Sequence, residues 1–276
     1  MLTAGADSSP RRSAVLAAGA EASLVPAIVF GLALAVYLLT APPGLTWAHD
    51  SADGGDLITA ALTRAVPHPS GYPTWTLLAA LFSYLPLGAA AWRATLLSMV
   101  SAAAAAALVA ATVPWLAPAG SARLVRRTAG EPWRRAASPA VFLLSITPPL
   151  VAGLALAFSP LLWGQATVAE VYALHTGLAA GALWALVRRQ AGGGQRWAAG
   201  AGLFLGLGLG NHLTTAWLLP AAGILFWSAG GHARGRVQTF AAGAAGLGAG
   251  LLVYLYLPWA AAGDPPVQWA DLCSLD

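Results

Sequence analysis

The sequence predicts an all-α integral membrane protein. Its 276 residues are 58% hydrophobic and only 9% charged, and its mean hydropathy is +0.68, whereas soluble domains contain about 25% charged residues. Apolar stretches recur at close to the ~20 residues that a helix needs to cross the hydrocarbon core of a bilayer. The alternating ten-residue segments of a membrane β-barrel are absent. We therefore expect a bundle of about seven transmembrane helices.

The expected chain order is a cytoplasmic N-terminal tail (1–23), a helical membrane domain (24–260) with a first outer loop at 41–91, and an outer C-terminal segment (261–276). A cleaved signal peptide is the alternative for the N-terminus, but the first apolar run exceeds the usual ~7–15 residues. The expected spans are Leu24–Thr40, Trp92–Trp115, Pro139–Phe158, Val171–Val187, Trp197–Gly210, Leu213–Trp227 and Phe240–Trp259.

The segment Thr74–Leu87 is apolar but short, which favours an interfacial or re-entrant helix over a full crossing. The arginines support this choice, because all basic residues are Arg and cytoplasmic loops are enriched in positive charge. With Thr74–Leu87 at the interface, every arginine except Arg64 and Arg93 falls on the cytoplasmic side. The arginines form no stripe interleaved with aromatic residues, so we expect lipid and not nucleic acid as the partner. Cys273 is alone, which excludes an internal disulfide.

This topology gathers polar residues near the outer ends of the helices. Ionisable groups at membrane depth are costly and usually face a cavity or a partner, so these residues are candidates for one common site. They are Asp50, Asp53, Asp56, His68, Arg93, Glu170, His175, Asn211, His212 and Asp264.

The first outer loop contains the densest polar stretch. Asp53 and Asp56 stand at the start of a helix expected over 56–66, where the helix dipole favours ionised carboxylates. Such carboxylates can cap the helix, bind a metal or act as a general base on a hydroxyl, and the local pattern leaves these alternatives open. His68 and the prolines after it predict a turn. Arg93 suits a phosphate or carboxylate ligand, with snorkelling to headgroups as the alternative.

The later outer turns supply further candidates. Glu170 and Tyr172 begin the fourth span, and His212 lies in a break between two apolar runs that is also consistent with a simple tight turn. Glycines at four-residue spacing, Gly202 with Gly206 and Gly246 with Gly250, indicate close packing between helices.

Taken in order, five stretches resemble successive motifs of one membrane protein family: "DGGDLITAALTRAVPHPSGYPTW", "WRATLLS", "LLWGQATVAEVYALHTGL", "GLGLGNHLTTAWLLP" and "YLPWAAAGDPPVQWAD". The chain resembles, over roughly residues 25–272, the bacterial branch of the family that includes a eukaryotic transmembrane protein O-mannosyltransferase. That family lies within the GT-C glycosyltransferase superfamily.

The resemblance implies a seven-helix core with a large first outer loop that carries juxtamembrane helices and an acidic catalytic residue. It further implies transfer of a sugar, with inversion, from a polyprenyl-phosphate donor to an acceptor hydroxyl outside the cytoplasmic membrane, with protein O-mannosylation as the known example. No cofactor and no divalent metal are expected. Asp53 or Asp56 would be the base, and the residues expected to bind substrate are Asp50, His68, Arg93, Glu170, Tyr172 and His212.

Two alternatives remain at this stage. A transporter or lipid flippase would need ionisable groups near the bilayer midplane and two related halves, neither of which the sequence shows. A catalytically silent scaffold is the other. Enzymes of the superfamily usually continue well beyond the seventh helix, whereas this chain ends at Asp276. The expected explanations are a shortened gene product, a fragment, or a core that works with a separate partner, which would supply recognition of the acceptor, a protein or a glycan.

Overall fold

The structure is a computed structural model, and it describes residues 9–116, 139–229 and 231–268. The described residues are helical apart from turns and one isolated parallel bridge between Val66 and Gln268. Five of the arginines expected on the cytoplasmic side, and Cys273, lie outside the described residues; these arginines are Arg123, Arg126, Arg127, Arg134 and Arg135. The all-α prediction is confirmed.

Every span expected from the sequence coincides with a helix or with two or three consecutive helices. In chain order the elements are α1 (Ser9–Thr40), η1 (Ala48–Asp50), α2 (Gly54–Thr63), α3 (Pro73–Ser83), α4 (Ala90–Leu116), α7 (Pro139–Ala157), α8 (Pro160–Ala166), α9 (Val171–Gln190), α10 (Gln195–Leu209), η2 (Leu213–Leu218), α11 (Leu219–Ala229), α12 (Ala233–Leu251), η3 (Leu252–Leu255) and α13 (Tyr256–Ala261).

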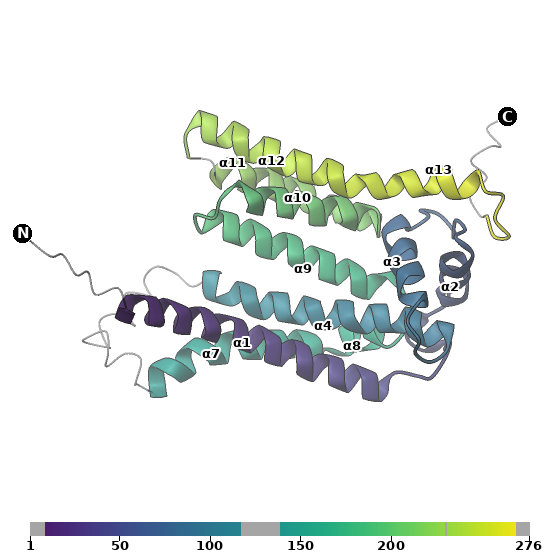
Figure 1. The fold of residues 1–276 in the computed structure, drawn as a ribbon, viewed down its shortest axis with the longest axis horizontal. Helices are drawn as coiled ribbons and strands as arrows, with labels where there is room; N and C mark the ends of the chain where they lie inside the picture. The colour runs from purple at the N-terminus through teal and green to yellow at the C-terminus, as the bar shows by residue number, and fades with distance from the viewer. Residues whose placement is uncertain (1–8, 117–138, 230, 269–276) are drawn as a thin grey trace, which may run out of the picture.

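The long helices lie side by side in one bundle, and α2 and α3 lie across one of its ends (Figure 1). From one edge to the other, α7 and α1 pack on α4, α4 packs on α9, α9 on α10, and α10 on α12. We call the end with α2 and α3 the site end. The opposite end is the arginine end, because α9 finishes and α10 and α12 begin there with Arg188, Arg189, Arg196, Arg234 and Arg236.

Two helices of the described chain are long and apolar enough to cross a membrane, Ala90–Leu116 and Ala233–Ala261. A third span results if α7 and α8 are counted together, although they are bent by 62° at the break between them. The prolines at Pro148 and Pro149 within α7 and Pro160 at the start of α8 remove backbone donors along this broken segment.

The remaining helices are too short or too polar to meet the same criterion, so seven spans stay a prediction. Leu24–Thr40 and Leu213–Ala229 are apolar but short. The 15 residues of α10 reach only ~22 Å, against ~30 Å of hydrocarbon. The short α3, with Pro73 in its first turn, lies at the end of the bundle, as expected for an interfacial helix (Figure 1).

Glycine lets α10 and α12 pack backbone to backbone. A Cβ atom added at Gly202 would collide with the carbonyl oxygen of Gly243, and one at Gly246 with the carbonyl oxygen of Ala199. The four-residue glycine spacing therefore has the packing role that the sequence predicts. This contact holds α12, and through it α13, against the part of the molecule that carries the site.

Candidate functional site

The site is built around the start of α2, where Asp53 occupies the N-cap position. Its side chain forms no capping hydrogen bond, so capping does not account for this carboxylate. Helix α2 begins at Gly54, two residues earlier than expected, and ends at Thr63 because Arg64 adopts a left-handed conformation with φ 56°. The helix thus presents Asp53 and, one turn later, Asp56 towards the same loop.

That loop supplies His68, whose imidazole lies between the two carboxylates. The Nδ1 atom lies 2.8 Å from Asp56 Oδ2, and Nε2 lies 3.5 Å from Asp53 Oδ2. The backbone N–H of His68 also donates to Asp56 Oδ2, at 3.0 Å. Asp56 therefore contacts both the ring and the backbone N–H of His68, and these two contacts fix the position of the imidazole. We call these three side chains the carboxylate–imidazole cluster.

The two carboxylates differ in access to solvent. The side chain of Asp53 is 54% exposed, that of Asp56 only 18%, and that of His68 24%. Asp56 forms two hydrogen bonds with His68, whereas the carboxylate of Asp53 is largely exposed to solvent. A substrate hydroxyl would reach Asp53 more easily than Asp56.

A turn after His68 anchors the cluster on the rest of the bundle. The N–H of Gly71 donates to the carbonyl of His68 at 2.9 Å, and Gly71 takes φ 82°, which suits glycine. Thr74, in the first turn of α3, then bonds the end of α10, with its N–H on the Gly210 carbonyl (2.9 Å) and its hydroxyl on the Leu207 carbonyl (2.7 Å). The predicted turn thus joins the first loop to α10.

Glu170 lies behind the cluster. It is only 2% exposed, and its Oε1 accepts the backbone N–H of Asp53 at 3.3 Å. Its carbonyl oxygen accepts Trp75 Nε1 and Ser98 Oγ. Burial, and next the charge of Asp53, raise the pKa of Glu170 to about 7. Glu170, one of the residues expected to bind substrate, is thus buried in this structure and in contact with the backbone at the start of α2.

Aromatic and imidazole rings form a wall beside the cluster. The ring of Tyr72 lies 5.0 Å from that of His68 and 6.4 Å from that of His212, and Tyr172 lies 5.6 Å from His212. Tyr172 is 46% exposed. Burial, followed by the charge of Asp53, raises the pKa of the Tyr72 phenol, and burial lowers the pKa of His212. Of the predicted substrate-binding residues, His68, Tyr172 and His212 are brought together here.

His175 and Asn211 complete this wall, although the sequence analysis assigns no specific role to either. The ring of His175 lies 5.5 Å from that of His212, and its nitrogens lie 3.3–3.4 Å from the hydroxyls of Thr215 and Thr214. Asn211 is fully buried and donates to the Val171 carbonyl at 3.0 Å. The sequence signal that could have identified His175 as a site residue is its position three residues after Tyr172 on the same helix.

Two of the predicted residues, Arg93 and Asp50, form no ion pair with the cluster within the described part of the chain. Arg93 donates from Nη1 to the Leu85 carbonyl at 3.0 Å, and its buried Nε has no hydrogen-bond partner. Asp50 is exposed, with φ 60° at the end of η1.

The described residues contain no group of three or more His, Cys, Asp or Glu side chains arranged to hold a metal ion. The cluster instead has the parts of an acid–base site, which are an accessible carboxylate, an imidazole oriented by a second carboxylate, and ring faces that can lie against a sugar.

Fold and site together define a helical membrane protein with a carboxylate–imidazole cluster at one end of its bundle. Residues 53–233 match the family model of the N-terminal domain of protein O-mannosyl-transferase TMEM260, and the chain belongs to this family. The match begins at Asp53 and takes in all of the cluster and its aromatic wall.

The chain is also similar to the mouse protein O-mannosyl-transferase TMEM260. The two are 44% identical over 86 residues, which is 31% of this chain and 12% of the mouse protein. The alignment thus spans about an eighth of the length of this curated relative. No solved structure matches the chain.

Proposed function

We propose that this chain is the catalytic membrane part of an inverting glycosyltransferase of the GT-C type, from the bacterial branch of its family. It would transfer a sugar from a polyprenyl-phosphate donor to an acceptor hydroxyl, with O-mannosylation of protein as the leading form. The observation that carries the proposal is the carboxylate–imidazole cluster within the matched family region. The name of the mouse relative, a protein O-mannosyl-transferase, supports the same class of reaction.

The geometry favours Asp53 as the base, because its carboxylate is the more exposed of the two. Asp53 would take the proton from the acceptor hydroxyl while that oxygen attacks the anomeric carbon. The bond from this carbon to the phosphate oxygen breaks, and the polyprenyl phosphate leaves with the electron pair. Asp56 would hold His68 in place, and Glu170 would hold the backbone of Asp53.

Arg93 is the proposed partner of the donor phosphate. Its guanidinium donates one N–H to the Leu85 carbonyl, and its Nε has no hydrogen-bond partner in the described structure. It lies in the first turn of α4, next to the interfacial helix α3, where a lipid-linked phosphate would arrive. A planar guanidinium suits phosphate because it can donate two parallel hydrogen bonds.

The proposed orientation places the site end outside the cytoplasmic membrane, because the arginines gather at the opposite end. Gly44 and Gly194 test this, since a Cβ atom at either would meet nothing within 4 Å. In a Cys273→Ser background, Gly44→Cys should react with a membrane-impermeant thiol reagent added to intact cells, and Gly194→Cys only after permeabilisation. The reverse pattern would overturn the orientation.

The function itself is tested by transfer from radiolabelled polyprenyl-phosphate sugars in lipid vesicles. Wild type should consume the mannose donor and label an acceptor polypeptide, and the double variant Asp53→Asn/Asp56→Asn should not. Thr59→Val is the matched control, because Thr59 is an exposed residue of α2 whose hydroxyl bonds only the Gly55 carbonyl. Full activity in the double variant would sink the proposal, as would a wild-type protein that consumes no donor.

A further inference from the structure

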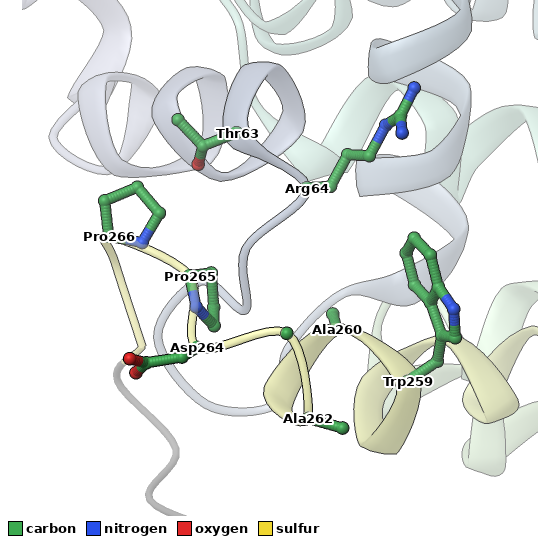
Figure 2. Close-up of a pocket in the computed structure, with 9 residues that line it drawn as sticks. Thr63, Arg64, Trp259, Ala260, Ala262, Asp264, Pro265 and Pro266 are labelled. Carbon is green, nitrogen blue, oxygen red and sulfur yellow. The ribbon is translucent and has the colours of Figure 1, made fainter.

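A pocket lies at the other end of α2, away from the carboxylate–imidazole cluster. Its volume is about 480 Å³, and it lies between the C-terminus of α2 and the chain that follows α13. Figure 2 shows Thr63 and Arg64 on one side and Trp259, Asp264, Pro265 and Pro266 on the other. Trp259 and Asp264 fall after the region matched by the family model.

The lining offers several kinds of contact within a short distance. Arg64 is exposed, and its Nη2 donates to the hydroxyl of Tyr84 at 2.8 Å, which holds the guanidinium at the rim. Trp259 is 61% exposed and presents a large ring. Asp264 is exposed and brings a negative charge to the same pocket.

The pocket shares a wall with the carboxylate–imidazole cluster. The chain from Arg64 to His68 runs from one to the other, and the hydroxyl of Tyr256 holds this stretch through the Ala65 carbonyl at 2.9 Å. Val66 forms its bridge with Gln268, which fixes the segment after Pro266 against the same stretch. A ligand in the pocket would therefore lie at a set position relative to His68.

We infer that this pocket is a subsite for the acceptor polypeptide, an inference that rests on the proposed glycosyl transfer. A cation, a carboxylate and an aromatic ring together suit a peptide, which carries charged, amide and apolar groups along one chain. A polyprenyl tail would leave both charges unpaired. A lone phosphate would be repelled by Asp264.

The distance between the pocket and the cluster predicts how long an acceptor peptide must be to reach both. Helix α2 has ten residues, so its two ends are ~15 Å apart. An extended peptide advances ~3.3 Å per residue, so roughly four to five residues link a hydroxyl at Asp53 to a side chain in the pocket. Peptides that reach the pocket therefore need about five residues on one side of the modified Ser or Thr.

The experiment compares a long acceptor peptide, which reaches the pocket, with a short one that does not. In the wild-type protein the long peptide should have the lower KM. Trp259→Ala and Arg64→Ala should raise the KM of the long peptide about tenfold, the usual effect of losing an aromatic or Arg anchor. They should leave kcat and the KM of the short peptide unchanged. Trp227→Ala, an exposed Trp on α11 towards the arginine end, is the matched control.

A second measurement separates this inference from the proposed function. The long peptide carries a photo-reactive group at the residue expected in the pocket, and crosslinked residues are located by mass spectrometry. Crosslinks to residues 259–266 support the subsite even if no sugar is transferred. The absence of sugar transfer would refute only the proposed function. Transfer with unchanged long-peptide KM in both variants, an equal loss with both peptides, or crosslinks only elsewhere would overturn the subsite.

Discussion

Replacing Glu170 by Gln tests the support behind the cluster. The carboxylate of Glu170 is buried and accepts a hydrogen bond from the backbone N–H of Asp53. A glutamine has nearly the same shape, and its amide oxygen can accept that bond, but it cannot ionise. The substitution therefore isolates the cost of a buried negative charge next to Asp53, and the expected result is a variant that is more stable than wild type at alkaline pH.

The magnitude follows from the raised pKa of Glu170. A shift from 4.5 to about 7 corresponds to about 3 kcal/mol. Because the folded pKa is the higher one, the folded state binds more protons between these values. The free energy of unfolding of wild type should fall by this amount as pH rises from about 4.5 through 7, and it should then reach a plateau. The glutamine variant should lack that loss.

The assay is unfolding of both proteins in one detergent at a series of pH values from 4.5 to 8.5, followed by tryptophan fluorescence. The difference between the two unfolding free energies should grow with pH and level off above pH 7. Asp53→Asn removes the neighbouring charge and should shift this change to lower pH. A difference between Glu170→Gln and wild type that is the same at every pH would refute the reasoning.

Three further outcomes are expected. Gly246→Ala should destabilise the protein by about 1–3 kcal/mol, because the new Cβ meets the Ala199 carbonyl, while Gly248→Ala, which meets nothing within 4 Å, should not. Unfolding in detergent compares the two, and equal stability would count against the packing account. Arg93→Ala should weaken donor binding at least tenfold in a vesicle binding assay, since it removes a charge-assisted contact; unchanged binding would remove Arg93 from the donor site. His68→Ala should lower kcat by about tenfold through loss of one oriented hydrogen bond, and an unchanged kcat would mean that the imidazole has no part in turnover.

The sequence predicted the helices well because their signal is local. Apolar runs of adequate length and the prolines that interrupt them placed each expected span on an observed helix. Positive charge then indicated which helix ends belong together, and Asp53, His68 and Glu170, far apart in the chain, do lie at one end of the bundle. The number of membrane crossings is less local, because α10 and α11 are short and depend on their neighbours.

The roles within the site were beyond the sequence, because they depend on which atoms face each other. Capping by Asp53 is a sound local alternative, and only the structure shows that its side chain forms no capping hydrogen bond and lies 3.5 Å from the imidazole of His68. The burial of Glu170 depends on Trp75 and Ser98, which come from two other helices. The ring contact of His175 with His212 likewise joins residues on separate elements.

The most direct test of the account is to measure kcat and donor affinity separately for Asp53→Asn and Asp56→Asn. A general base contributes about 10²–10⁴-fold to the rate. We predict that Asp53→Asn lowers kcat by at least about a hundredfold while donor affinity stays near that of wild type, and that Asp56→Asn has a smaller effect through His68. Wild-type turnover by Asp53→Asn would contradict the account, because the exposed carboxylate of the cluster would then take no part in the chemistry.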